Sequence, residues 1–182
     1  MKKVLLFSIL FVFSIISVFA YETIIIKYPP GELWVKAYYK KIGNEAILQY
    51  VPKGQTSKEW NRTIIVHSYE HSGYPVRNFL TGQLAGMTKN NPTGNYKYLK
   101  WDDIDSIAGR CTEDYKNIKA QCEFYRVTRA HGGLISLHYI NKDKDDFMQN
   151  YNQWFEIIKR AKYYNSYYRD ERTFDKAEYF EL

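Results

Sequence analysis

The sequence contains little glycine and proline, with 10 Gly and 5 Pro among 182 residues. This scarcity excludes a collagen-like or low-complexity chain. Strong net charge is also missing, because the formal charge is +6 while 45% of the residues are hydrophobic. These values exclude a disordered chain that cannot form a core. A chain of this length is expected to form one domain.

Long apolar runs are absent after residue 20, but one lies before it. Residues 4–19 carry no charge and follow Lys2 and Lys3, and Val18 and Ala20 occupy the −3 and −1 positions of a cleavage site. This order is typical of a secretory signal peptide. The run is shorter than the about 20 residues that span a bilayer, although an uncleaved anchor is the alternative. We expect residues 1–20 to be a signal peptide cleaved after Ala20, and residues 21–182 to form a single domain. That domain is expected in the periplasm or outside the cell and not across the membrane.

A block of basic residues is also absent. The lysines and arginines are scattered, and loss of Lys2 and Lys3 would reduce the net charge to +4. Such a small excess of positive charge is not typical of a nucleic-acid-binding protein. The sequence has no phosphate-cradling loop and neither of the serine-hydrolase motifs G-x-S-x-G and S-x-x-K. We therefore expect no nucleic-acid partner and no cofactor.

Cysteine is limited to Cys111 and Cys122. An even number of cysteines in an exported chain favours a disulfide bond. A catalytic thiol would need a neighbouring base, which the segment around Cys111 lacks, and a redox pair would usually have the spacing C-x-x-C. We expect one structural disulfide between these two residues.

The pattern of apolar residues predicts both strands and helices. A helix is expected over Pro75–Lys89, and a longer one over Asp145–Tyr164, whose Phe147, Tyr151, Trp154, Ile158 and Ala161 form one apolar stripe. Residues 96–107 are ambiguous between a strand and a helix start. Strands are expected over Thr23–Tyr28, Leu33–Lys41, Glu45–Val51, Arg62–Tyr69, Gln121–Ala130 and Leu134–Asn141.

This order of elements predicts an α+β fold in a single domain. Its sheet is expected to be mostly antiparallel, with a short central helix and a long C-terminal helix packed on it, as in an α/β/α sandwich. Trp154 lies at the centre of the apolar stripe of the C-terminal helix. We expect it to have a structural role in the core.

One local pattern resembles a catalytic motif. His67, Glu70 and His71 match H-x-x-E-H, in which two histidines on one face of a helix bind zinc and the glutamate activates water. Here the motif follows a strand-like segment and is broken at once by Ser72-Gly73-Tyr74-Pro75. In a strand, residue 70 would point away from residues 67 and 71. A looser metal site could add His131 or His138. The alternative is that these histidines lie at strand ends and turns without binding metal.

Aromatic residues are abundant, with 18 Tyr, 10 Phe and 4 Trp. Tyr163, Tyr164, Tyr167 and Tyr168 are too close together for all of them to enter a core. They form either a binding face for a protein or glycan partner, or a surface that packs under the tail. In the last 18 residues, Phe174 and Phe180 are further candidate anchors.

The segment Val51-Pro52-Lys53-Gly54, followed by Trp60 and by Thr63–Val66, resembles a signature of small exported bacterial proteins of uncharacterised function. The paired cysteines and the closing helix with a tryptophan are similar too. The order of elements resembles the Mog1/PsbP-like sandwich. The resemblance implies no catalytic residues. In it, Pro52 ends a strand, Gly54 makes the turn, and Trp60 is expected to fill the core below that turn.

Two functions remain open at this point. The first, which we favour, is a non-enzymatic binding protein, secreted or associated with the envelope, whose partner is an envelope or host protein or a glycan. The second is a metal-dependent hydrolase built on His67, Glu70 and His71. The conformation of residues 62–71 distinguishes the two hypotheses. Only a helix would place both histidines and the glutamate as a zinc hydrolase requires, so a strand would argue against the hydrolase.

Overall fold

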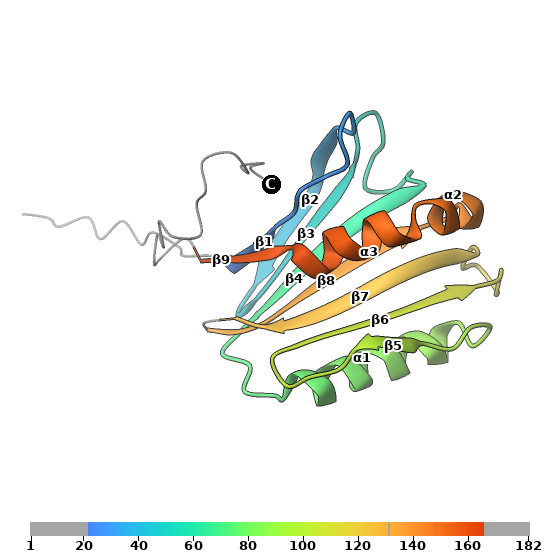
Figure 1. The fold of residues 1–182 in the computed structure, drawn as a ribbon. Helices are drawn as coiled ribbons and strands as arrows, with labels where there is room; N and C mark the ends of the chain where they lie inside the picture. Colours follow the sequence, from blue (N-terminus) through green and yellow to red (C-terminus); the bar gives the residue numbers. More distant parts are fainter. Residues whose placement is uncertain (1–21, 131, 166–182) are drawn as a thin grey trace, which may run out of the picture.

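A computed structural model describes residues 22–130 and 132–165. This part of the chain folds into a seven-stranded antiparallel sheet, a small two-stranded sheet and three helices (Figure 1). The large sheet has the strand order β2-β3-β4-β8-β7-β6-β5. Its strands are β2 (Trp34–Ile42), β3 (Glu45–Pro52), β4 (Arg62–Glu70), β5 (Lys97–Lys100), β6 (Asp105–Thr112), β7 (Gln121–Arg129) and β8 (Gly133–Asn141).

The large sheet joins two runs of strands that are distant in sequence. Strands β2, β3 and β4 form one meander, and β5 to β8 form another. The two meet where β4 pairs with β8 over nine residues, with Val66 opposite Leu137. Gly133 begins β8 close to the end of β4, and a Cβ atom there would lie 2.0 Å from the Tyr69 carbonyl oxygen. A side chain at residue 133 would therefore push these two strands apart.

The helices cover the sheet on both faces. Helix α1 (Val76–Asn90) packs on one face against β6 and β7, around a core that includes Leu80, Leu84 and Tyr125. Helices α2 (Lys144–Gln149) and α3 (Tyr151–Arg160) pack on the other face, mainly against β7 and β8. The domain is therefore an α+β fold with three layers, which confirms the predicted class.

Trp154 occupies the centre of the core on the α3 side. Its ring stacks on Tyr139 of β8 with the centroids 4.1 Å apart, and it meets the edge of Trp34 at 5.5 Å. Both Trp154 and Tyr139 are almost completely buried. The apolar stripe of the C-terminal helix thus faces the sheet, because its members recur at the period of a helix.

The C-terminal helix differs from its predicted range. It is interrupted at Asn150, whose side chain donates from Nδ2 to the Asp146 carbonyl oxygen at 3.1 Å, and it ends at Arg160. Residues Lys162–Asn165 instead form β9, which pairs antiparallel with β1 (Glu22–Ile25). The prediction failed here because pairing with a strand about 140 residues away leaves no local signal.

Trp60 is not the core residue that the resemblance implied. It is half-buried, lies outside both hydrophobic clusters, and has the Lys142 ammonium 3.7 Å from its ring centroid. Residues 55–60 contain no helical turn. The loop is held instead by the Thr56 side chain, whose hydroxyl accepts from the Glu59 backbone N–H at 3.0 Å. The Lys142 ammonium also donates to the Trp60 carbonyl oxygen at 2.9 Å, so this lysine contacts both the ring and the backbone of Trp60.

The expected disulfide joins Cys111 of β6 to Cys122 of β7. The two residues lie directly opposite each other in the ladder between these strands. A disulfide suggests an oxidising compartment outside the cytoplasm. The predicted signal peptide, residues 1–20, lies outside the described residues. In residues 22–130 and 132–165, no helix has the length and apolar character needed to cross a membrane.

Candidate functional site

Strand β2 is a long edge strand with exposed apolar side chains. On one side it pairs with β3, and on the other side it pairs with no strand of the described chain. Val35, Tyr38, Tyr39 and Ile42 are between 39% and 63% exposed, as is Leu33 just before the strand. An edge strand presents a row of backbone donors and acceptors that another strand can join.

The exposure of β2 follows from the positions of the helices. Helix α1 lies over β6 and β7, and α2 and α3 lie over β7 and β8. Figure 1 shows β2 at the edge of the sheet beyond these helices. Tyr38 and Tyr39 point to opposite faces of the sheet, since side chains alternate along a strand. Both faces of β2 are therefore exposed to solvent at Tyr38 and Tyr39.

The register shows which backbone groups of β2 point outward. Ile42 pairs with Glu45 across the two-residue turn Gly43-Asn44, and such a closing pair exchanges hydrogen bonds. The bonded and non-bonded pairs then alternate along the hairpin. Lys41 and Tyr39 are consequently non-bonded positions, whose N–H and C=O groups point away from β3. A partner strand would bond to these groups.

The charge along β2 is positive. Lys36 and Lys40 are exposed, whereas Lys41 forms an ion pair with Glu70 of β4, Nζ to Oε1 2.9 Å. A shift in register, a bulge, lies between Lys36 and Tyr38. Lysines and bulges on an edge disfavour uncontrolled strand addition, so a strand that pairs here has to compensate the positive charge. The edge is thus accessible, and its exposed charges, Lys36 and Lys40, are positive.

The opposite edge of the sheet is protected. Strand β5 has only four residues, and its pairing with β6 is irregular between Tyr98 and Lys100. Lys100 is held by Asp105, Nζ to Oδ2 2.7 Å. Short, irregular and charged edges resist strand addition. Of the two edges, β2 is the longer, with nine residues against four in β5.

The histidine motif does not assemble into a zinc site. Residues 62–70 form β4, so His67 and Glu70 point to opposite faces of the sheet. His67 contacts Glu45 through Nε2 at 3.1 Å and the Tyr69 hydroxyl through Nδ1 at 2.7 Å. Burial lowers the pKa of His67, which favours the neutral ring that donates to Glu45 and accepts from Tyr69. Both ring nitrogens are occupied, so neither can bind a metal in this arrangement.

The other members of the proposed metal site are also apart. Glu70 is paired with Lys41, and His71 lies in the turn after β4 with a φ of 61°. His138 contacts Glu123 rather than the motif, and His131 lies outside the described residues. Within the part of the chain that the structure describes, no three His, Cys, Asp or Glu side chains form a group that could hold a metal ion.

A buried charged cluster lies under the C-terminal end of α1, and the sequence had not indicated it. The Glu123 carboxylate contacts Arg110 Nε at 2.6 Å, His138 Nε2 at 2.7 Å and the Tyr96 hydroxyl at 2.5 Å. Burial alone would raise the pKa of Glu123. The His138 charge and the hydrogen bonds outweigh it and lower the pKa to about 2. Because Glu123 is 1% exposed, this cluster holds β6, β7 and β8 together rather than meeting a ligand.

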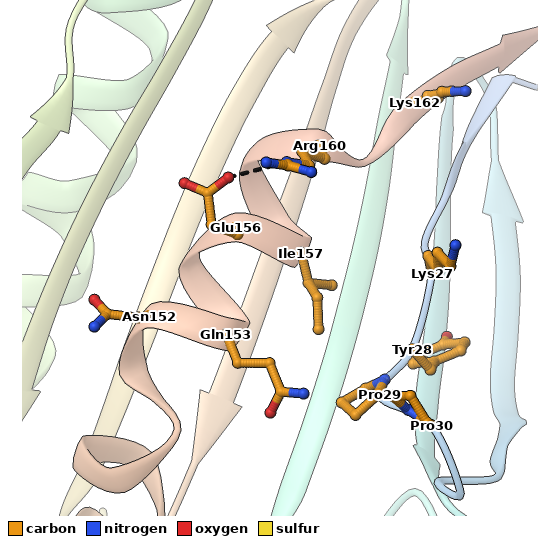
Figure 2. Close-up of a pocket in the computed structure, with 10 residues that line it drawn as sticks. All are labelled: Lys27, Tyr28, Pro29, Pro30, Asn152, Gln153, Glu156, Ile157, Arg160 and Lys162. Carbon is orange, nitrogen blue, oxygen red and sulfur yellow. Dashed lines mark hydrogen bonds and ion pairs between the residues drawn. The ribbon is translucent and has the colours of Figure 1, made fainter.

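A groove of about 840 Å³ lies between α3 and the segment that leads from β1 to β2 (Figure 2). Gln153 and Ile157 point from α3 towards Pro29 and Pro30 on the other wall. Three of the lining residues are basic and one is acidic. The groove is lined by Lys27, Tyr28, Pro29, Pro30, Asn152, Gln153, Glu156, Ile157, Arg160 and Lys162.

The tyrosine-rich face predicted near the C-terminus can be placed only in part. The backbones of Tyr163 and Tyr164 lie in β9, opposite Ile24 and Thr23 of β1. Tyr167 and Tyr168 lie outside the described residues. The exposed aromatic residues that the structure does describe are Tyr38, Tyr39, Tyr74, Tyr98 and Trp101.

No protein-family model, curated protein or solved structure matches this chain. The resemblance to small exported bacterial proteins and to the Mog1/PsbP-like sandwich therefore stays a prediction.

Proposed function

We propose that this is an exported, non-enzymatic binding protein that pairs with an extended acidic segment of a partner protein along β2. The observation that carries the proposal is the exposure of β2, an edge strand of nine residues with Val35, Tyr38, Tyr39 and Ile42 accessible. In strand addition, backbone hydrogen bonds supply affinity, and side chains on alternate faces supply specificity.

The charge of β2 favours a partner over a second copy of the chain. Two β2 strands side by side would bring the exposed lysines Lys36 and Lys40 of both copies to one shared edge, and positive charge gathered on adjacent strands is destabilising. A strand with glutamate or aspartate at matching positions would gain favourable pairs instead. Among the candidate partners, an acidic protein segment fits this edge better than a glycan, because an extended peptide can pair with the outward N–H and C=O groups of Tyr39 and Lys41.

The experiment uses synthetic peptides as probes. We would add a ten-residue peptide of alternating valine and glutamate to the ¹⁵N-labelled chain without residues 1–20. Backbone amide exchange would then be measured by NMR. The outward amides of Tyr39 and Lys41 should become protected, since strand addition pairs them. A matched peptide with lysine in place of glutamate should bind at least about tenfold more weakly, a difference typical of like-charge juxtaposition at an interface.

Three outcomes would contradict the proposal. The acidic peptide could fail to protect Tyr39 and Lys41 at millimolar concentration. The lysine peptide could bind equally well, which would remove the role of charge. Sedimentation could also show that the chain forms a dimer through β2, which would make a second copy the occupant of this edge.

A further inference from the structure

The groove between α3 and residues 27–30 has apolar walls that the core holds in place. On one wall, Tyr28 stacks on Trp34 with the ring centroids 5.2 Å apart, and Trp34 meets the edge of Trp154 at 5.5 Å. On the other wall, Ile157 packs against the same hydrophobic cluster. The volume of about 840 Å³ is in the range of small-molecule sites, which are usually preformed. The walls of this groove are therefore fixed before a ligand binds.

The shape of the apolar surface suits a flat ring. Figure 2 shows Ile157 and Gln153 directed from α3 towards Pro29 and Pro30 on the other side of the groove. An aromatic ring between these walls would bury both of its faces, and burial of aromatic surface is strongly favourable. The Gln153 amide adds a group that can donate and accept hydrogen bonds at the edge of such a ring.

The upper half of the groove in Figure 2 is positively charged. Lys27 follows β1, and Arg160 and Lys162 lie at the end of α3 and the start of β9. Glu156 is the single acidic residue of the lining. It is already paired with Arg160, Oε2 to Nε 3.0 Å, and with Lys159, Oε1 to Nζ 3.1 Å. Positive charge is thus in excess at this end, where a carboxylate would gain favourable interactions.

The C-terminal end of α3 does not prevent an anion from binding nearby. Free carbonyl groups at the end of a helix carry partial negative charge and disfavour anions. Here the buried Arg126 of β7 donates from Nη1 to the carbonyl oxygens of Ile158 at 2.8 Å and Ala161 at 2.7 Å. These two carbonyl groups are therefore hydrogen-bonded from the side of the sheet, and the side chains of the groove keep their positive charge.

We propose that the groove between α3 and residues 27–30 binds a small aromatic carboxylate. The ring of the ligand lies between Pro30 and Ile157, its carboxylate faces Lys27, and the Gln153 amide meets its far edge. Fixed apolar walls together with an excess of positive charge at one end favour this ligand over a neutral sugar or a cation. The inference does not depend on the proposed binding at β2, because the two sites share no residue.

The test uses 2-naphthoate and its neutral counterpart 2-naphthylmethanol as probes. Each is titrated into the ¹⁵N-labelled protein, and the shifts of the backbone amide signals are followed by NMR. We expect 2-naphthoate to shift the signals of Gln153 and Ile157 with a dissociation constant near or below about 1 mM, as for a ligand of this size. The alcohol should bind at least about fivefold more weakly, because it lacks the charge that faces Lys27.

Two pairs of variants separate charge from apolar contact. Lys27→Gln should weaken 2-naphthoate binding about threefold, the value of an exposed charge pair, and leave the alcohol unaffected. Lys97→Gln removes the same charge from β5 and should change neither probe. Ile157→Ala should weaken both probes several-fold, whereas Ile104→Ala, at an isoleucine that is 69% exposed in the loop before β6, should weaken neither. The dispersion of the amide signals shows that each variant is folded.

Three results would overturn the proposal. Equal affinity of the parent for both probes would show that the charge of the groove plays no part. Largest shifts at the amides of Tyr39 and Lys41 would place the probe on β2 instead of in the groove. Shifts of Gln153 and Ile157 that do not saturate within the solubility of 2-naphthoate would show that the groove has no affinity for an aromatic carboxylate. None of these results would affect the peptide experiment on β2.

Discussion

Arg110 and Glu123 face each other across β6 and β7 as a buried ion pair, with Nε 2.6 Å from Oε1 and side-chain exposures of 4% and 1%. They are the neighbours of Cys111 and Cys122 in the same ladder. Arg110 also donates to the Asn91 carbonyl oxygen at 3.0 Å, just after α1. The pair thus connects the disulfide-linked hairpin to the end of a helix.

The stability of the protein is predicted to fall at acid pH because of Glu123. Its folded pKa of about 2 lies below the ordinary value of 4.5. A depressed carboxyl pKa contributes stability above the unfolded pKa, which is lost as the pH falls from about 4.5 towards 2. The contribution is about 3 kcal/mol. Urea unfolding at a series of pH values would measure it.

Glu123→Gln is the control for this pH dependence. The variant leaves Arg110 buried without its carboxylate partner, so it should be less stable than the parent at pH 7. The difference between the two proteins should shrink as the pH falls through this window. A difference in the free energy of unfolding that stays constant from pH 7 to pH 3 would show that Glu123 does not titrate as described.

The disulfide between Cys111 and Cys122 is predicted to stabilise the domain by about 3 kcal/mol, the chain-entropy expectation for a short loop. Replacing both cysteines with alanine should lower the free energy of unfolding by this amount. Chemical reduction of the parent should have the same effect, and reductant should not alter the double variant. Unfolding of the parent at the same urea concentration with and without reductant would contradict the prediction.

Trp154→Ala should cost about 3–5 kcal/mol, because the tryptophan is almost completely buried against Tyr139. Trp101→Ala is the matched control. Trp101 is 42% exposed, so its loss should cost less than about 1 kcal/mol. Thermal or urea unfolding of both variants would measure these costs. Equal losses in the free energy of unfolding would mean that the apolar stripe of α3 does not stabilise the core.

The local pattern of the sequence was sufficient for most of the architecture. The stripe from Phe147 to Ile158 predicted the face that α2 and α3 bury, since helical periodicity survives the break at Asn150. The strands β2, β3, β4, β7 and β8 lie close to their predicted ranges, because runs of β-branched and aromatic residues and the turns that bound them are local signals. The pairing of β9 with β1 could not be predicted, because it joins the two ends of the described chain.

The buried cluster could have been found from the disulfide. If Cys111 and Cys122 lie opposite each other on antiparallel strands, then Arg110 and Glu123 must also be opposite. The pattern of residues 96–107 is ambiguous between a strand and a helix start, so it does not predict the strand that carries Arg110 and Cys111, and the register does not follow from the sequence. The exposure of β2 was hidden for a different reason. The local sequence of an edge strand resembles that of an inner strand, and only the position of the helices shows which faces stay uncovered.

We predict that the histidine motif, His67, Glu70 and His71, does not bind zinc. His67 and Glu70 lie on opposite faces of β4, and both nitrogens of His67 are already hydrogen-bonded. His67→Ala should therefore leave the amount of zinc bound by the purified protein unchanged. Equilibrium dialysis of parent and variant would measure this. Loss of bound zinc in the variant, with folding intact, would restore the metal-site hypothesis.

The most direct test of the account compares two substitutions at Tyr39. Tyr39→Ala removes the side chain but keeps the outward N–H, whereas Tyr39→Pro removes both and leaves the hydrogen bonds to β3 intact. Affinity for the valine–glutamate peptide would be measured by titration, after circular dichroism has shown both variants to be folded. Strand addition at β2 predicts that the proline variant binds roughly tenfold more weakly than the alanine variant, the value of one backbone hydrogen bond. Equal affinities would contradict binding through the backbone of β2.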